Sequence, residues 1–132
     1  MINPSLFLRR AIQADAVFSG ASAVLLTLGA GELATLLDLP EALLSETGLF
    51  LITYTALAGW LGTRQAMPKA LVVIVIAGNA AWAVASIALL FSGTVTPNLL
   101  GEAFVVIQAI AVGALGELQY VGWRRSGEAL AA

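Results

Sequence analysis

Residues 70–91 read ALVVIVIAGNAAWAVASIALLF, and Asn79 is the one strongly polar side chain among them. An α-helix needs about 20 predominantly apolar residues to cross the hydrocarbon core of a bilayer. The stretch is long enough, carries no charge, and lacks the strict alternation of a barrel strand. Because a helix satisfies its own backbone hydrogen bonds in lipid, the stretch predicts a membrane-spanning helix.

Three further apolar stretches, residues 11–28, 44–61 and 99–121, are also long enough to cross a membrane. The 132-residue chain is 60% hydrophobic and 11% charged, whereas a globular domain is about half apolar and a quarter charged. We therefore expect an all-α fold, a four-transmembrane-helix bundle, that forms a single integral membrane domain over residues 1–132.

All basic side chains fall on one side of the predicted spans. Two precede the first span, two lie between the second and third, and two follow the fourth: Arg9, Arg10, Arg64, Lys69, Arg124 and Arg125. Cytoplasmic loops of membrane proteins are enriched in Lys and Arg. We therefore expect a multi-pass protein with both termini and the central loop in the cytoplasm.

The connection between the first two spans, residues 29–43, is longer than a helical hairpin needs. Leu33, Leu36, Leu37 and Leu39 follow one another near helical spacing, beside acidic side chains. This pattern is typical of a short amphipathic helix at the membrane surface. An ordinary leucine-rich packed loop explains it equally well.

The chain also matches itself at one constant offset, which predicts an internal repeat. Asp15-Ala16, Ala21-Ser22, Leu25-Leu26 and Gly29 correspond to Asn79-Ala80, Ala85-Ser86, Leu89-Leu90 and Gly93. Repeats in membrane proteins are commonly related by a symmetry axis. We expect two tandem helical hairpins related by a pseudo-twofold axis along the membrane normal.

Composition excludes several kinds of chemistry. The chain contains no Cys and no His, which removes thiolate nucleophiles, iron–sulfur clusters and histidine-ligated zinc or haem. The net charge of −2 and the separated pairs of basic residues do not suit a nucleic-acid partner. We expect no catalytic residues, no metal site and no cofactor.

Ionisable side chains inside a membrane need a reason, because each costs about 2.5–3.5 kcal/mol on insertion scales. We predict a polar cavity, open toward the cytoplasm, that is lined by Asp15, Asn79 and Glu117, with Ser22 and Ser86 on matching helix faces. Paired carboxylates in such a cavity can exchange protons or bind a cation. The alternative is structural: each acid would form a salt bridge with a nearby cytoplasmic arginine and fix the helix register.

Two further side chains within the spans suit a ligand or a partner. Trp82 lies mid-span, one helical turn after Asn79, and is predicted either to wall a hydrophobic ligand pocket or to pack in the core. Gln108 stands nine residues before Glu117, so it points to nearly the opposite side of the helix. This predicts that Gln108 either helps to wall a ligand pocket or makes a separate contact with a partner such as another subunit.

Three motifs give the chain a resemblance to a known kind of protein. They are Asn79-x-x-Trp82, the stretch Glu117-Leu118-Gln119-Tyr120, and the closing Arg124-Arg125 pair. The chain resembles small uncharacterised bacterial four-span integral membrane proteins of a loosely DoxX-like kind, over nearly its whole length. The resemblance implies a four-helix fold in the bacterial cytoplasmic (inner) membrane, and it implies no mechanism and no catalytic residues.

These observations favour a non-enzymatic protein that self-associates or is an accessory subunit of a membrane complex. Membrane lipid and either itself or another membrane protein would be its partners, because small residues at four-residue spacing, such as Ala77, Ala81 and Ala85, let helices approach closely. The alternative is a small homo-oligomeric proton- or cation-coupled transporter or channel that uses the carboxylates of Asp15 and Glu117. A third hypothesis is an enzyme, whose chemistry would be restricted to reactions of lipids catalysed by carboxylates.

Overall fold

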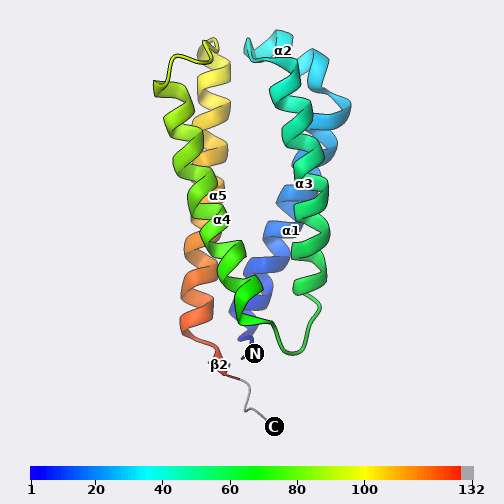
Figure 1. Cartoon of the computed structure of the whole chain (residues 1–132), viewed down its shortest axis with the longest axis vertical. Coiled ribbons are helices and arrows are strands. Elements are labelled where there is room, and N and C mark those ends of the chain that lie inside the picture. Colours follow the sequence, from blue (N-terminus) through cyan, green and yellow to red (C-terminus); the bar gives the residue numbers. More distant parts are fainter. Residues whose placement is uncertain (129–132) are drawn as a thin grey trace.

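The computed structural model describes residues 1–128 and consists almost entirely of helices (Figure 1). The helices are α1 (Leu6–Leu28), α2 (Ala30–Leu37), α3 (Glu41–Leu61), α4 (Lys69–Phe91) and α5 (Leu99–Arg124). Two short strands, β1 (Ile2–Asn3) and β2 (Gly127–Glu128), pair in antiparallel fashion. The predicted all-α fold with four long apolar helices is confirmed.

The boundaries of the long helices follow from the residues at their ends. Ser5 caps α1 by accepting a hydrogen bond from the amide of Leu8, and Asn98 caps α5 through the amide of Gly101. Pro40 and Pro68 directly precede α3 and α4. Because the cap at Ser5 lies before the basic pair, α1 begins five residues earlier than the predicted start at residue 11.

The connection after α1 forms a helix, as one of the two alternatives predicted, and its place at the membrane surface stays a prediction. This helix, α2, ends at Leu37, and the capping residue Asp38 has a left-handed conformation with φ of 56°. A polar aspartate tolerates this conformation better than most residues. The turn redirects the chain into α3, and Leu37 and Leu39 on either side of Asp38 are buried.

The long helices form two pairs. Helix α3 packs along α1, α4 packs along α5, and α1 packs on α5 to join the pairs, as Figure 1 shows. A twofold axis that relates the two hairpins would exchange α1 with α4 and α3 with α5. The packing of α1 on α5 would then be repeated between α4 and α3, and the described residues show no comparable packing there. The hairpins are therefore present, while their pseudo-twofold relation stays a prediction.

At the end that carries both termini, the two pairs are held together tightly. Ile2 and Met67 exchange two backbone hydrogen bonds of 2.8 Å, and the Ser5 amide donates to the hydroxyl of Ser126. Ile2, Leu8 and Met67 are buried with neighbouring side chains from α1, α3 and α4 in one core cluster. We call this half of the bundle the terminal end.

At the opposite end, which we call the α2 end, the pairs touch along one side only. The amide of Asn98 donates to the carbonyl of Leu37, and its side-chain amide donates to that of Leu36 over 2.8 Å. A Cβ atom on Gly101 would overlap the carbonyl oxygen of Leu37. These contacts join α2 to the start of α5, and they leave the side between α3 and α4 without a comparable tie.

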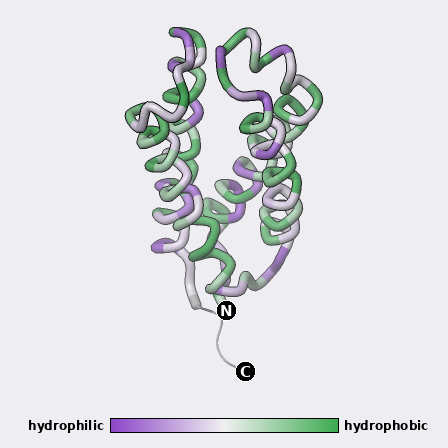
Figure 2. Tube along the Cα trace, turned by 45° about the horizontal axis from the view of Figure 1, so that its top comes forward, coloured by the Kyte–Doolittle hydropathy of each residue, from purple (hydrophilic) through white to green (hydrophobic). Residues whose placement is uncertain are grey.

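Most of the apolar surface of the long helices faces outward. Of the most apolar segment of each long helix, no more than 33% is buried inside the bundle. Hydrophobic colours accordingly dominate the long helices in Figure 2. Water does not tolerate so much exposed apolar surface, whereas lipid does.

Candidate functional site

A buried carboxylate joins all four long helices. Oδ2 of Asp15 on α1 accepts hydrogen bonds from the Tyr54 hydroxyl of α3 at 2.5 Å, Asn79 Nδ2 of α4 at 2.8 Å and Gln119 Nε2 of α5 at 2.9 Å. Its other oxygen, Oδ1, accepts from the Ser19 hydroxyl at 3.1 Å. We call Asp15, Ser19, Tyr54, Asn79 and Gln119 the Asp15 node.

The hydrogen bonds of the node are largely satisfied within it. Asn79 Nδ2 also donates to Gln119 Oε1 at 2.8 Å, and Gln119 Nε2 also contacts the carbonyl oxygen of Ala11. Asp15 is 1% exposed and Gln119 is fully buried. A buried polar group is stable only when it is paired, so each member depends on the others.

The node differs from the predicted salt bridge. Among the described residues, the side-chain partners of Asp15 are uncharged. The guanidinium group of Arg9 donates instead to the carbonyl oxygens of Gly62 and Arg64, and thereby ties α1 to the loop after α3. Hydrogen bonds between helices, rather than an ion pair, fix their register at Asp15.

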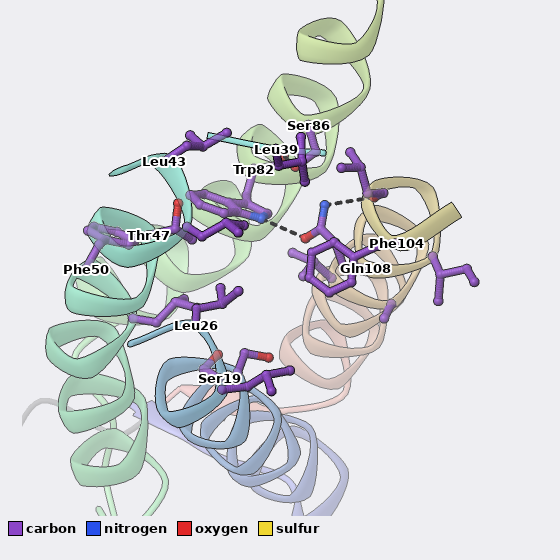
Figure 3. A pocket seen from close by; sticks show the side chains of 18 of the residues that line it. Ser19, Leu26, Leu39, Leu43, Thr47, Phe50, Trp82, Ser86, Phe104 and Gln108 are labelled. Carbon is purple, nitrogen blue, oxygen red and sulfur yellow. Dashed lines mark hydrogen bonds between the residues drawn. The ribbon is translucent and has the colours of Figure 1, made fainter. Parts of the chain in front are cut away.

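A large cavity lies directly beyond the node, toward the α2 end. Its volume is about 940 Å³, and all five helices contribute to its wall. The lining is mostly leucine, phenylalanine, alanine and valine, with Ser19, Tyr54 and Asn79 of the node at its polar limit. Figure 3 shows Leu26, Leu39, Leu43 and Phe104 around this space.

The predicted site residue Trp82 lies in the wall of this cavity. Its indole Nε1 donates to Gln108 Oε1 over 3.0 Å (Figure 3), and Gln108 Nε2 donates to the carbonyl of Val105. The Trp82 ring also stacks with Phe50 of α3, with 6.1 Å between ring centroids and 3° between planes. The pocket-wall alternative for Trp82 is thus the one that the geometry matches.

The remaining predicted residues divide between the cavity and the outer surface. Ser22 and Ser86 line the cavity, and the hydroxyl of Ser86 donates to the carbonyl of Trp82. Gln108 lines it too and accepts the indole hydrogen bond of Trp82, which matches the pocket-wall alternative, while a contact with another subunit stays a prediction. Glu117 lies on an exposed face of α5 and does not join Asp15.

The geometry therefore differs from the predicted polar cavity in both composition and direction. Neither acid lines the cavity: Asp15 is buried behind Ser19, Tyr54 and Asn79, and Gln119 rather than Glu117 is the α5 residue that faces the core. The cavity extends from the node toward the α2 end, whereas the basic residues that define the predicted cytoplasmic side lie at the terminal end. Within residues 1–128, no cluster of side chains suits a metal ion.

The fold and the composition define the class of the protein: it is an all-α, multi-pass membrane protein with a deep apolar cavity above a buried polar node. Comparison with protein families, with curated proteins and with solved structures found no match to the chain. Its function must therefore be argued from the site.

Proposed function

We propose that the protein is a non-enzymatic membrane protein that holds one hydrophobic molecule from the bilayer inside its helix bundle. The observation that carries this proposal is the cavity of about 940 Å³ with an almost wholly apolar lining. Ligand sites measure about 300–1,000 Å³ and combine apolar walls with a few polar groups. Water in such a space would find few partners, while hydrocarbon fits the lining.

The node supports binding rather than catalysis. Its donors already have acceptors within the chain, so a ligand needs no polar group to satisfy them. Trp82 and Gln108 are likewise paired with each other. A site in which most polar groups are already paired recognises a molecule mainly by shape and apolar contact, which suits a hydrophobic ligand.

Filling the cavity should expel the ligand. Gly78 belongs to the stripe of α4 that lines the cavity with Ile74 and Trp82, and a Cβ atom there meets no other atom within 4 Å. We expect Gly78→Leu to lower the amount of lipid that co-purifies with the protein by at least about tenfold, equivalent to ~1.4 kcal/mol of binding free energy. Native mass spectrometry of protein extracted in mild detergent measures this amount.

Gly59→Leu is the matched control for that experiment. A Cβ atom on Gly59 also meets nothing within 4 Å, and Gly59 of α3 does not line the cavity. The two variants gain the same side chain and the same helix propensity. Equal lipid retention in both variants would contradict the proposal.

A second candidate function, proton- or cation-coupled transport, is favoured by one observation. Asp15 is a buried ionisable group hydrogen-bonded to Ser19, Tyr54 and Asn79, which line the cavity, and ionisable groups inside a membrane often mark ion pathways. Proton-driven uptake into liposomes that is abolished by Asp15→Asn and unaffected by Glu117→Gln would support transport. Absence of any proton-dependent flux would contradict transport, and binding would remain as the proposed function.

The proposed membrane topology and cellular location are supported by the charge distribution and by the resemblance. The six basic residues gather at the terminal end, which supports a location with both termini in the cytoplasm. The DoxX-like resemblance supports the bacterial cytoplasmic membrane. Self-association or a role as an accessory subunit stays a prediction, supported by the exposed small residues Ala77 and Ala81 of α4.

A further inference from the structure

We infer that the molecule held in the cavity is the acyl chain of a bilayer lipid with a zwitterionic headgroup, and that it enters sideways between α3 and α4. This inference rests on the proposed binding function and adds the ligand class and its route. The juxtaposition that carries it is the Phe50–Trp82 stack, which spans the one side of the cavity that the helices leave unpacked.

Three other flanks of the cavity are tied by hydrogen bonds or by helix packing. Toward the terminal end, the Asp15 node joins all four long helices. On the side opposite the gap between α3 and α4, α1 packs along α5. At the α2 end, Asn98 is hydrogen-bonded to Leu36 and Leu37, and Gly101 lies against the Leu37 carbonyl. A molecule that enters past any of these must break hydrogen bonds or separate backbones.

The side between α3 and α4 requires only that two aromatic rings part. Phe50 is 56% exposed, so few neighbours other than the Trp82 ring hold its side chain in place. Trp82 is held by Gln108 and does not need to move when Phe50 swings away. Because α3 and α4 cross the membrane, the space outside this stack is filled by lipid chains, and these are the molecules that can enter.

The charge around the α2 end selects the headgroup. The exposed charged residues at that end are all acidic, namely Glu32, Asp38, Glu41, Glu46 and Glu102, whereas all six basic residues lie at the terminal end. A lipid whose chain fills the cavity from this half of the membrane has its headgroup beside these acids. Like charges repel, so an anionic headgroup is disfavoured relative to a zwitterionic one.

The route can be tested because the chain has no native cysteine. In one protein, Phe50→Cys and Trp82→Cys are joined by a short, reducible reagent that links two thiols. In a second protein, Thr47→Cys and Ala85→Cys are joined in the same way, one turn nearer the α2 end on the same two helices. A third protein joins Leu36→Cys to Asn98→Cys at the α2–α5 contact, where the link takes the place of the side-chain hydrogen bond that Asn98→Cys removes. Exchange of bound lipid for lipid with deuterated chains is followed by native mass spectrometry.

We expect either α3–α4 cross-link to slow lipid exchange by at least about tenfold, as for a blocked gate, with recovery on reduction. The Leu36–Asn98 cross-link should leave the rate within about twofold of the same protein without reagent. Slowed exchange with the Leu36–Asn98 link and normal exchange with both α3–α4 links would overturn the sideways route while leaving binding intact. If no lipid is bound before cross-linking, the binding function itself fails.

The headgroup is tested by competition. Protein in nanodiscs with equal amounts of zwitterionic and anionic lipids of identical chains should retain the zwitterionic lipid in at least about threefold excess, the scale of exposed charge interactions. Glu46→Gln combined with Glu102→Gln should reduce that excess. Equal retention of the two lipids, or an excess of the anionic lipid, would overturn the headgroup assignment.

Discussion

Replacing Asp15 by alanine is expected to lower the free energy of unfolding by about 3 kcal/mol, because Tyr54, Asn79 and Gln119 then lose a common acceptor. An unsatisfied buried donor costs about 1–3 kcal/mol, and interhelical hydrogen bonds in membranes average about 0.6 kcal/mol. Unfolding by sodium dodecyl sulfate in mixed micelles, followed by tryptophan fluorescence, measures the change.

Two further variants separate the node from a general effect of charge. Asp15→Asn keeps one acceptor oxygen at the same place, so we expect about half the loss seen with alanine. Glu117→Ala removes an acid from an exposed face of α5 and should change stability by less than about 0.5 kcal/mol. If Asp15→Ala were as mild as Glu117→Ala, the node would not hold the bundle together.

The other large effect is expected at Gly122, where α5 crosses α1. A Cβ atom there would lie 2.7 Å from the Cα atom and 2.9 Å from the amide nitrogen of Leu8. These are backbone atoms, so Gly122→Val must push the helices apart, and the bond from the Ser5 hydroxyl to the Gly122 carbonyl is weakened as well. We expect a loss of about 3 kcal/mol from overpacking and the lost bond.

Gly59→Val provides the matched control for Gly122→Val. It introduces the same side chain into a helix where a Cβ atom meets no atom within 4 Å, so any change reflects helix propensity, which is below about 1 kcal/mol. Both variants are compared in the same detergent unfolding assay. A Gly122→Val protein that is as stable as the Gly59→Val protein would show that α1 and α5 do not approach as closely as described.

The spans could be predicted from sequence because the hydropathy and the length of a span are properties of one continuous stretch of residues. Three of the four predicted spans end at the last helical residue, Leu28, Leu61 and Phe91. The starts of α1 and α3 were less predictable, since residues 6–10 and 41–43, which include Arg9, Arg10 and Glu41, extend these helices ahead of the predicted spans. A cap or a proline, rather than hydropathy, decides where these helices begin.

The site was predictable in part. The repeat placed Asp15 and Asn79 at equivalent positions, and the two side chains are hydrogen-bonded at 2.8 Å. Tyr54 and Gln119 were missed because hydropathy treats a tyrosine as an interface residue and a glutamine near a span end as ordinary. Glu117 was chosen instead of Gln119 since both lie at similar depth, and only the rotation of α5 against α1 decides which is buried.

The cavity could not be predicted from a single sequence. It exists because α1 and α5 pack together while α3 and α4 do not, and this difference depends on how the two hairpins dock. Residues such as Gly78 and Ala85 have the same small side chains whether they face a neighbouring helix, a lipid or an empty space. Small residues indicate that something packs closely against the helix, but they do not show whether it is another helix, a lipid or a ligand.

The presence of a lipid chain in the cavity is tested most directly by a crystal structure grown in a lipid mesophase doped with lipid brominated along one acyl chain. We expect anomalous bromine density inside the bundle, between Trp82 and Phe104, with the Asp15 node intact beneath it. Bromine density confined to the outer surface, with α3 packed against α4 and no cavity between them, would contradict it.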